Sequence, residues 1–377
     1  RVGEFDLAIR GLIQQGWAAL LLALAILLPQ CCRAQSVVFI NPGRSNETYW
    51  RTAAEAMEVA AGSLKMQLEV RYAERNPLQA ITIARELAAR PKNARPRFVV
   101  FANESGIAPE MLRTLEAAQI DNFMAFSGLH DAARGSLGSP REKYKYWLGS
   151  LEPRAEDAGY LTARALIDAA KASSVAMTDG KLQLLAIAGD RSTPTSIARN
   201  AGMRRAVAES KDVVVLQEVY GEWSRERAAE QMRVLMQRYP AARTVWAGND
   251  EMAFGAMDAW RAKGGVPGRD GFFSAINTSA AALTAMRTGE LSALAGGHFM
   301  AGAWALVMLY DYAHGVDFAS EGLELTQPMF ILFDPPVIDW FEKRFSAAQS
   351  PLNFRHYSKA LNPRLKTYGF EINKLLR

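Results

Sequence analysis

The sequence is poor in the residues that build disulfides and thiolate metal sites. Only two of its 377 residues are cysteines, Cys31 and Cys32, and both lie in the amino-terminal segment. From residue 35 onward there is no thiol, so this part of the chain has no disulfide and no cysteine-ligated metal. An oxidising compartment is therefore harmless to it.

Histidine is also scarce, and the common catalytic signatures are missing. The chain has four histidines, and none stands at a His-Glu or Cys spacing that suits a metal. No Gly-x-Ser-x-Gly turn, Walker loop or dinucleotide fingerprint occurs. We therefore expect a protein that is not an enzyme and that needs no cofactor.

Charge is not concentrated anywhere in the chain. The net charge is +5, and no Lys/Arg-rich run marks a nucleic-acid surface. Hydrophobic residues make up 49% and charged residues 22% of a length that suffices for two cored domains. These values favour a two-domain globular protein that does not bind nucleic acid.

The amino-terminal segment resembles an export signal. The uncharged apolar run Gly16–Leu28 follows Arg10 and ends at Pro29, and it is short for a membrane span, which needs roughly 20 residues. Small residues near Ala34 offer a peptidase site before Gln35. We expect residues 1–34 to be a cleaved signal peptide and the mature chain to be periplasmic. A leader retained as an anchor is the alternative.

From residue 37 onward, segments typical of strands and of helices alternate, which indicates parallel sheets covered by helices on both faces. The expected strands are Val37–Ile40, Gln67–Tyr72, Arg97–Ala102, Phe123–Phe126, Tyr146–Leu148, Leu182–Ala188, Val213–Val219, Arg243–Ala247, Gly271–Ile276 and Leu291–Ala295. The expected helices are Tyr49–Ser63, Pro77–Ala89, Pro109–Ala118, Ala155–Ala172, Thr195–Ser210, Ser224–Arg238, Glu251–Lys263, Ser279–Arg287 and Ala301–His314.

One turn is more specific than the rest. A short buried strand ends at Gly248, and Asn249-Asp250 then caps a helix that contains Glu251 and Met252. Polar residues at the carboxyl end of a parallel strand lie where α/β sheets bind ligands. This Asn-Asp-Glu-Met-Ala turn resembles that of type 1 periplasmic sugar-binding proteins, the ribose-binding protein group.

The resemblance implies an α/β fold of two Rossmann-like lobes with parallel sheets, joined by a three-strand hinge. Chain crossings are then expected near Gly149–Pro153, Asn277–Ser279 and Gly315–Ala319. The first lobe would comprise residues 36–150 plus 279–314, and the second residues 151–278 plus 319–345. Residues 346–377 exceed the family pattern; we expect this extension to pack on a lobe, with contact to a partner as the alternative.

In the first lobe, ligand-binding candidates follow the first and fourth strands. Asn46 and Glu47 precede the adjacent aromatics Tyr49 and Trp50, which can stack on a sugar-like ring. The resemblance places an Asn-rich loop with paired aromatics here and a polar group at Ser127. The alternative is that Tyr49 and Trp50 are core residues.

In the second lobe, the resemblance points to strand ends and to one helix. Its implied contacts are Asp190, Arg199, Trp223, Asn249 and Asn277, and a further candidate, His298, stands close to Gly296 near the tenth strand. Arg199 would donate a fork of hydrogen bonds to ligand hydroxyls or a carboxylate, and Trp223 would be an aromatic lid. A surface or interlobe salt bridge is the alternative for Arg199.

Three positions depart from the family pattern. Ser127-Gly128 stands where Asp-Arg is frequent, Asn277 replaces an aspartate, and Gly296 replaces a glutamine. Because these polar groups grip sugar hydroxyls in the family, pyranose specificity is not expected.

The sequence therefore predicts a monomeric, exported receptor for a small polar, sugar-like ligand. Its partner would be an ABC permease. The alternative is a sensory subunit that presents its ligand to a membrane sensor.

Overall fold

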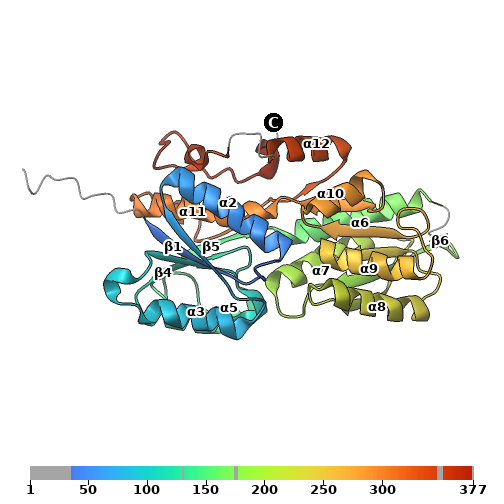
Figure 1. Ribbon diagram of the computed structural model, residues 1–377, viewed down its shortest axis with the longest axis horizontal. Helices are drawn as coiled ribbons and strands as arrows, with labels where there is room; N and C mark the ends of the chain where they lie inside the picture. The colour runs from blue at the N-terminus through green and yellow to red at the C-terminus, as the bar shows by residue number, and fades with distance from the viewer. Residues whose placement is uncertain (1–34, 130, 174–176, 346–350, 376–377) are drawn as a thin grey trace, which may run out of the picture. The chain divides into compact units, whose positions relative to one another are not determined.

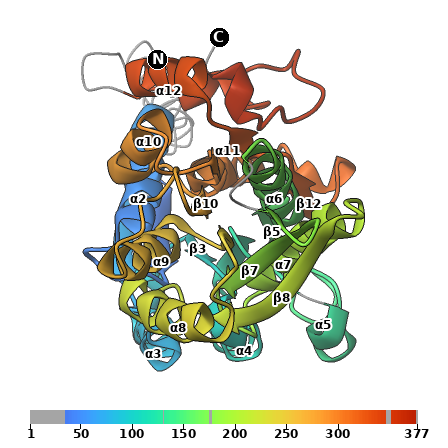
Figure 2. The ribbon, with the colours of Figure 1, turned by 90° about the vertical axis from the view of Figure 1, so that its right-hand side faces the viewer.

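The computed structural model describes residues 35–129, 131–173, 177–345 and 351–375. The expected signal peptide, residues 1–34, lies outside these ranges. Within them, no helix has both the length and the apolar character needed to cross a membrane. The described chain forms two sheets, and we call the parts built on them the first and the second lobe (Figures 1 and 2).

The first lobe has a six-stranded parallel sheet in the order β12-β5-β4-β3-β1-β2. Its strands are β1 (Ser36–Asn41), β2 (Gln67–Tyr72), β3 (Phe98–Phe101), β4 (Asp121–Ala125), β5 (Trp147–Pro153) and β12 (Glu324–Gln327). Its helices are α2 (Thr48–Leu64), α3 (Pro77–Ala89), α4 (Ala108–Ala117), α5 (Asp131–Leu137) and α11 (Ala301–Ala313).

Burial on both faces explains the continuous apolar runs of these strands. In β1, Val37 and Phe39 pack with α2 and α11, whereas Val38 and Ile40 pack with α3 and α4. Because side chains alternate along a strand, a run of four apolar residues fills both helical layers. The prediction of a parallel sheet with helices on both faces is confirmed.

The second lobe has the same layered plan, with a sheet of seven strands. Two of them pair antiparallel with a neighbour: β6 with β7, and β13 with β11. Its strands are β6 (Met177–Thr178), β7 (Lys181–Ala188), β8 (Val213–Tyr220), β9 (Thr244–Ala247), β10 (Phe272–Ile276), β11 (Ala293–Gly296) and β13 (Ile331–Leu332). Its helices are α6 (Ala155–Lys171), α7 (Pro194–Ala208), α8 (Arg225–Arg238), α9 (Asp250–Ala262) and α10 (Ala280–Arg287).

The crossings between lobes differ from those expected. The chain leaves the first sheet after Pro153, close to the expected place, but the segment after Asn277 stays in the second lobe because β11 pairs with β10. The second crossing is therefore at 296–301. The third is at 327–331, because β12 joins the first sheet beside β5. Residues 301–327 thus belong to the first lobe and residues 280–296 to the second.

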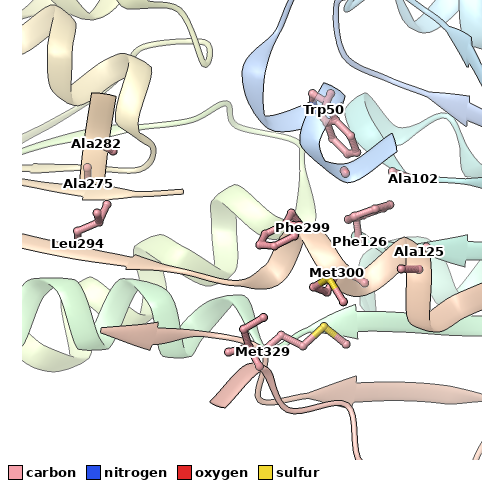
Figure 3. Packing of buried hydrophobic residues seen from close by; sticks show 14 of the residues in the cluster. Trp50, Ala102, Ala125, Phe126, Ala275, Ala282, Leu294, Phe299, Met300 and Met329 are labelled. Atoms are coloured by element: carbon pink, nitrogen blue, oxygen red, sulfur yellow. The ribbon is translucent and has the colours of Figure 1, made fainter. Parts of the chain in front are cut away.

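The crossing segments contact one another. The Arg154 backbone N–H donates to the carbonyl of Gln327 at 2.8 Å. At Gly297, whose φ is 113°, a Cβ would lie 2.8 Å from the carbonyl oxygen of Met329. Only glycine accommodates both this backbone conformation and this approach. Figure 3 shows Phe299, Met300 and Met329 among the buried side chains of this region.

The carboxyl-terminal segment contacts both lobes. Helix α12 (Pro335–Arg344) lies on α10, where Arg287 donates to Asp339 at 2.6 Å. Residues 351–375 then pack on α2 and α11 of the first lobe, along the upper side of Figure 1. Asp311, which is fully buried, accepts hydrogen bonds from this segment, namely from the Ser358 hydroxyl, the backbone of Lys359 and Ala360, and the Tyr368 hydroxyl. The extension thus packs on a lobe, as expected.

Candidate functional site

Two adjoining cavities lie at the carboxyl ends of the parallel strands, between the lobes. The inner cavity, of about 40 Å³, is lined by Glu47, Tyr49, Trp50, Arg75, Glu104, Phe126, Pro153, Ala155, Thr195, Arg199, Trp223, Asn249, Asn277, His298 and Phe330. The outer cavity, of about 490 Å³, is lined by Arg44, Asn46, Glu47, Thr48, Arg75, Glu104, Ser105, Asp190, Ser192, Glu222, Trp223, Ser224, Arg225, Glu226 and Glu251.

Sheet topology explains why these residues meet. In the first sheet the strand order reverses between β1 and β3, and Glu47 and Glu104 follow these two strands. In the second sheet the reversal is between β7 and β9, and Asp190 and Asn249 follow those. Loops diverge at such a switch point and leave a crevice, which is the usual ligand position in open α/β sheets.

Arg199 is held at the inner cavity by close packing of α6 on α7. A Cβ at Gly159 would lie 1.8 Å from the carbonyl oxygen of Arg199, so only glycine permits this approach. The Arg199 guanidinium donates through Nη1 to the carbonyl of Gly248 at 2.7 Å and through Nη2 to Nε2 of His298 at 2.9 Å. Its Nε–H has no partner within the described part of the chain.

The Arg199 charge is buried without a carboxylate beside it. The side chain is 4% exposed, and the described residues place no Asp or Glu in ion-pair contact with it. The rings of Trp223 and Phe330 lie 5.7 Å and 5.9 Å from the guanidinium carbon. Burial lowers the pKa of Arg199 to about 10, so the group is still charged at neutral pH. The alternative of a structural salt bridge is therefore not what the described residues show.

Aromatic rings form one wall of the inner cavity. Tyr49 stacks on the His298 ring at 4.7 Å, and His298 stacks on Phe330 at 4.5 Å. Trp50 meets Tyr49 edge-on at 5.0 Å and is itself 3% exposed. Burial and the neighbouring Arg199 lower the pKa of His298 well below its usual value, so this imidazole is neutral. Trp50 is thus both a core residue and part of the cavity lining, the two roles that the sequence left open for it.

The Asn249 and Asn277 amides stand on the second-lobe side. The Asn249 side-chain oxygen caps α9 by accepting from the backbone of Met252 at 2.8 Å, which leaves its NH₂ group for other partners. Asn277 donates to Asp250 at 2.7 Å, and the Ser279 hydroxyl donates to the other Asp250 oxygen at 2.5 Å. Both carboxylate oxygens of Asp250 therefore already accept hydrogen bonds, and Asp250 itself does not line the inner cavity.

A cluster of two carboxylates around one guanidinium forms the first-lobe side. Arg75 reaches both oxygens of Glu47 through Nε and Nη2, and its Nη1 lies 3.3 Å from Glu104. Burial, with Asp190 and Glu47 nearby, outweighs Arg75 and raises the pKa of Glu104 to about 7. These three residues and Trp223 line both cavities, so they form the boundary between them.

A hydrogen bond to Asp190 fixes the Trp223 side chain within the second lobe. Its Nε1–H donates to Oδ2 of Asp190 at 2.7 Å, while Oδ1 of the same carboxylate accepts from the backbone of Ser192 and Thr193. These bonds outweigh burial and lower the pKa of Asp190. Trp223 has a φ of 59°, a conformation that is uncommon for a bulky residue and is found at ligand sites.

Most residues expected at the site line a cavity. Eight line the inner cavity and two, Asn46 and Asp190, line only the outer one. Ser127 lines neither: it is fully buried, because Phe126, with a φ of 71°, takes the place on the cavity wall.

The sequence interpretation missed several lining residues. Arg75 and Glu104 follow β2 and β3, so the rule that strand ends face the ligand could have found them. Phe330 lies in the third crossing, whose position the sequence did not reveal. No cluster of metal-ligating side chains occurs within the described ranges.

The comparisons agree with this geometry. Residues 37–317 match the model of a periplasmic binding protein domain. A periplasmic sugar-binding protein from Pseudomonas fluorescens is 36% identical over 91% of this chain and 100% of that one, with a TM-score of 0.80. Among curated proteins, none matches the chain.

Two more distant solved structures share the fold. The binding protein of the arabinose ABC transporter from Shewanella sp. ANA-3, bound to L-arabinofuranose, is 20% identical over 88% of this chain and 99% of that one (TM-score 0.67). A solute-binding protein from Actinobacillus succinogenes 130z with bound D-allose is 16% identical over 81% and 99% (TM-score 0.68).

Proposed function

Because the chain belongs to the periplasmic binding protein family, we propose that it captures a sugar-like ligand in the cleft formed by the two adjoining cavities and delivers it to an ABC permease. The observation that carries this proposal is the pairing of stacked rings with buried polar groups. Tyr49 and the stacked His298 offer a face for a sugar ring, and Arg199 with Asn249 offers hydrogen-bond donors at its edge.

The departures at Ser127 and Asn277 support a ligand other than a common pyranose. The solved relatives named above carry L-arabinofuranose and D-allose, so the compounds to examine include furanose-forming and rarer sugars. We propose the eleven residues singled out from the sequence, less Ser127, together with Arg75, Glu104, Phe126 and Phe330, as the ligand-binding set.

The test is to identify what the protein binds. Protein purified from cells is denatured and the released compound is analysed by mass spectrometry; in parallel, L-arabinose, D-ribose, D-galactose, D-allose and myo-inositol are titrated calorimetrically. Release or tight binding of a sugar is the expected result. Absence of any sugar in both experiments contradicts the proposal.

Export and partner follow from the same proposal. We infer that residues 1–34 are removed, that the mature chain begins near Gln35 as a monomer in the periplasm, and that it docks on a permease. Amino-terminal sequencing and light scattering of periplasmic protein check the first two points. An intact leader would instead support a membrane-anchored form. A chain that binds a membrane sensor and no permease would support the sensory alternative.

A further inference from the structure

The carboxylates around the cleft differ in how many hydrogen bonds they already accept. Asp190 uses both oxygens, one for Trp223 and one for the loop backbone. Asp250 uses both for Asn277 and Ser279. Glu47 accepts from Arg75 through both oxygens and from the backbone of Arg44 at 3.2 Å. None of these three has much acceptor capacity left.

Glu104 differs from these three. Within the described part of the chain its carboxylate accepts one hydrogen bond, from Nη1 of Arg75 to Oε2 at 3.3 Å, and Oε1 has no partner. The side chain is 15% exposed and lines both cavities, so the free carboxylate oxygen has the cleft as its surroundings. A buried carboxylate with so few donors is costly, which explains why burial raises its pKa to about 7.

On the opposite side of the inner cavity, hydrogen-bond donors lack acceptors. Nε of Arg199 and Nδ1 of His298 are buried without a partner among the described residues. Since Arg199 can only donate, Nε2 of His298 accepts and Nδ1 carries the hydrogen. The second-lobe and hinge side thus holds donors, and the first-lobe side an acceptor, whose hydrogen-bonding capacity the described residues do not use.

The charges of the lining also balance. When Glu104 is ionised, Glu47 and Glu104 offset Arg75 and Arg199, so the inner cavity then has no formal excess of either sign. This balance suits an uncharged molecule whose hydroxyl groups both donate and accept.

We propose that Glu104 is a specificity-determining ligand contact, which accepts hydrogen bonds from hydroxyl groups of an uncharged, polyhydroxylated ligand whose other edge accepts from Arg199. The inference rests on the proposed function. In the second lobe, Asn277 stands where the family has an aspartate that accepts from sugar hydroxyls; in this chain, Glu104 of the first lobe would supply such a carboxylate. Arg75 then positions Glu104 and keeps it near the ligand.

The experiment compares Glu104→Gln with Glu222→Gln. Glu222 lines only the outer cavity, so the second variant is a matched control for removal of a carboxylate from the cleft. The probe is the tightest-binding sugar of the panel above, together with its single-deoxy analogues, in calorimetric titrations of the full mature chain. Thermal melts confirm that both variants fold.

We expect Glu104→Gln to weaken binding of the parent sugar about 10- to 100-fold, the range for a hydrogen bond to a charged group. One deoxy analogue should bind the wild type that much more weakly than the parent, and the variant should no longer distinguish the two. Glu222→Gln should bind like the wild type. Parent-sugar affinity within twofold of the wild type in Glu104→Gln would overturn the inference while leaving the proposed function intact.

If Glu104→Gln does not fold, a structure of the wild type with the same sugar decides. A ligand hydroxyl within about 3 Å of Oε1 supports the contact, and its absence overturns it. A wild-type chain that binds no sugar of the panel and releases none contradicts the proposed function and this inference together.

Discussion

Arg199 donates to His298 across 2.9 Å, and the direction of this bond fixes the tautomer of the imidazole. A guanidinium has no acceptor, so Nε2 of His298 must accept and Nδ1 must carry the hydrogen. The bond also links α7 of the second lobe to the 296–301 crossing. The residue with the largest expected role in binding is thus attached directly to the hinge.

Replacement of Arg199 by alanine should weaken ligand binding more than any other single truncation at the site. The ligand oxygen would lose a charge-assisted hydrogen bond from a buried group, about 2–3 kcal/mol or roughly 30- to 150-fold in affinity. Arg204→Ala is the matched control, because Arg204 lies on the same helix but pairs with Glu218 at 2.7 Å and is 60% exposed. Calorimetric titration measures both, and normal binding by Arg199→Ala would refute its role.

Trp223→Ala should weaken binding somewhat less than Arg199→Ala and leave the fold intact. Trp223 is half-buried at the boundary between the cavities, so its removal opens the site rather than the core. Trp304, which is fully buried, provides the contrast. Its replacement by alanine should lower the free energy of unfolding by about 3 kcal/mol or more. Ligand-free thermal melts distinguish the two; a Trp223→Ala melt as low as that of Trp304→Ala would show a core role.

Ligand should close the lobes by rotation at the crossings near Pro153, at 296–301 and at 327–331. Small-angle scattering of the mature chain should show a smaller radius of gyration at saturating ligand. The control is Ser105→Cys with Thr193→Cys, since the Ser105 backbone N–H lies 3.4 Å from the Thr193 hydroxyl between the lobes. Once oxidised, this pair should give one profile with and without ligand. An unchanged wild-type profile would contradict a closing clamp.

Glu152→Gln should have a higher free energy of unfolding, relative to the wild type, at pH 8 than at pH 5. Burial raises the pKa of Glu152 to about 7, despite a hydrogen bond from the Gly128 backbone. A raised carboxylate pKa contributes stability that is fully present below the usual value of about 4.5 and is lost as the pH rises through 7. The wild type should therefore lose roughly 1–3 kcal/mol relative to the variant between pH 5 and pH 8.

Urea unfolding at both pH values measures this difference. Glu58→Gln provides the control for removal of a carboxylate from an exposed position. A Glu152→Gln difference that is independent of pH would show that the native carboxyl group titrates normally.

The sequence predicted the layered fold well because local periodicity carries that information. Val37–Ile40 and the capped turn at Asn249 correspond to β1 and to the start of α9. The second and third crossings were misplaced because strand pairing is a long-range property. Nothing local shows that β11 pairs with β10, or that β12 pairs with β5 across more than 150 residues.

Positions on the cavity wall were predictable where a residue type has one plausible use at a strand end or on the helix that follows. Asn249 and Asn277 follow β9 and β10, Arg199 lies on α7, and all three line the inner cavity. Glu104 was missed because a glutamate in a polar loop has no distinctive local pattern; its importance appears only once Asp190 and Asp250 are seen to be occupied. Phe330 depends on the third crossing and could not be placed before that crossing was known.

The partners of Asp311 make the first lobe dependent on a segment that is distant in the sequence. This buried carboxylate takes its hydrogen bonds from residues 358–368. Without those residues, α11 would have to bury an uncompensated charge, which costs several kcal/mol. A chain truncated before residue 358 should therefore hold the first lobe in a partly folded, protease-sensitive state, even though all strands of its sheet are present.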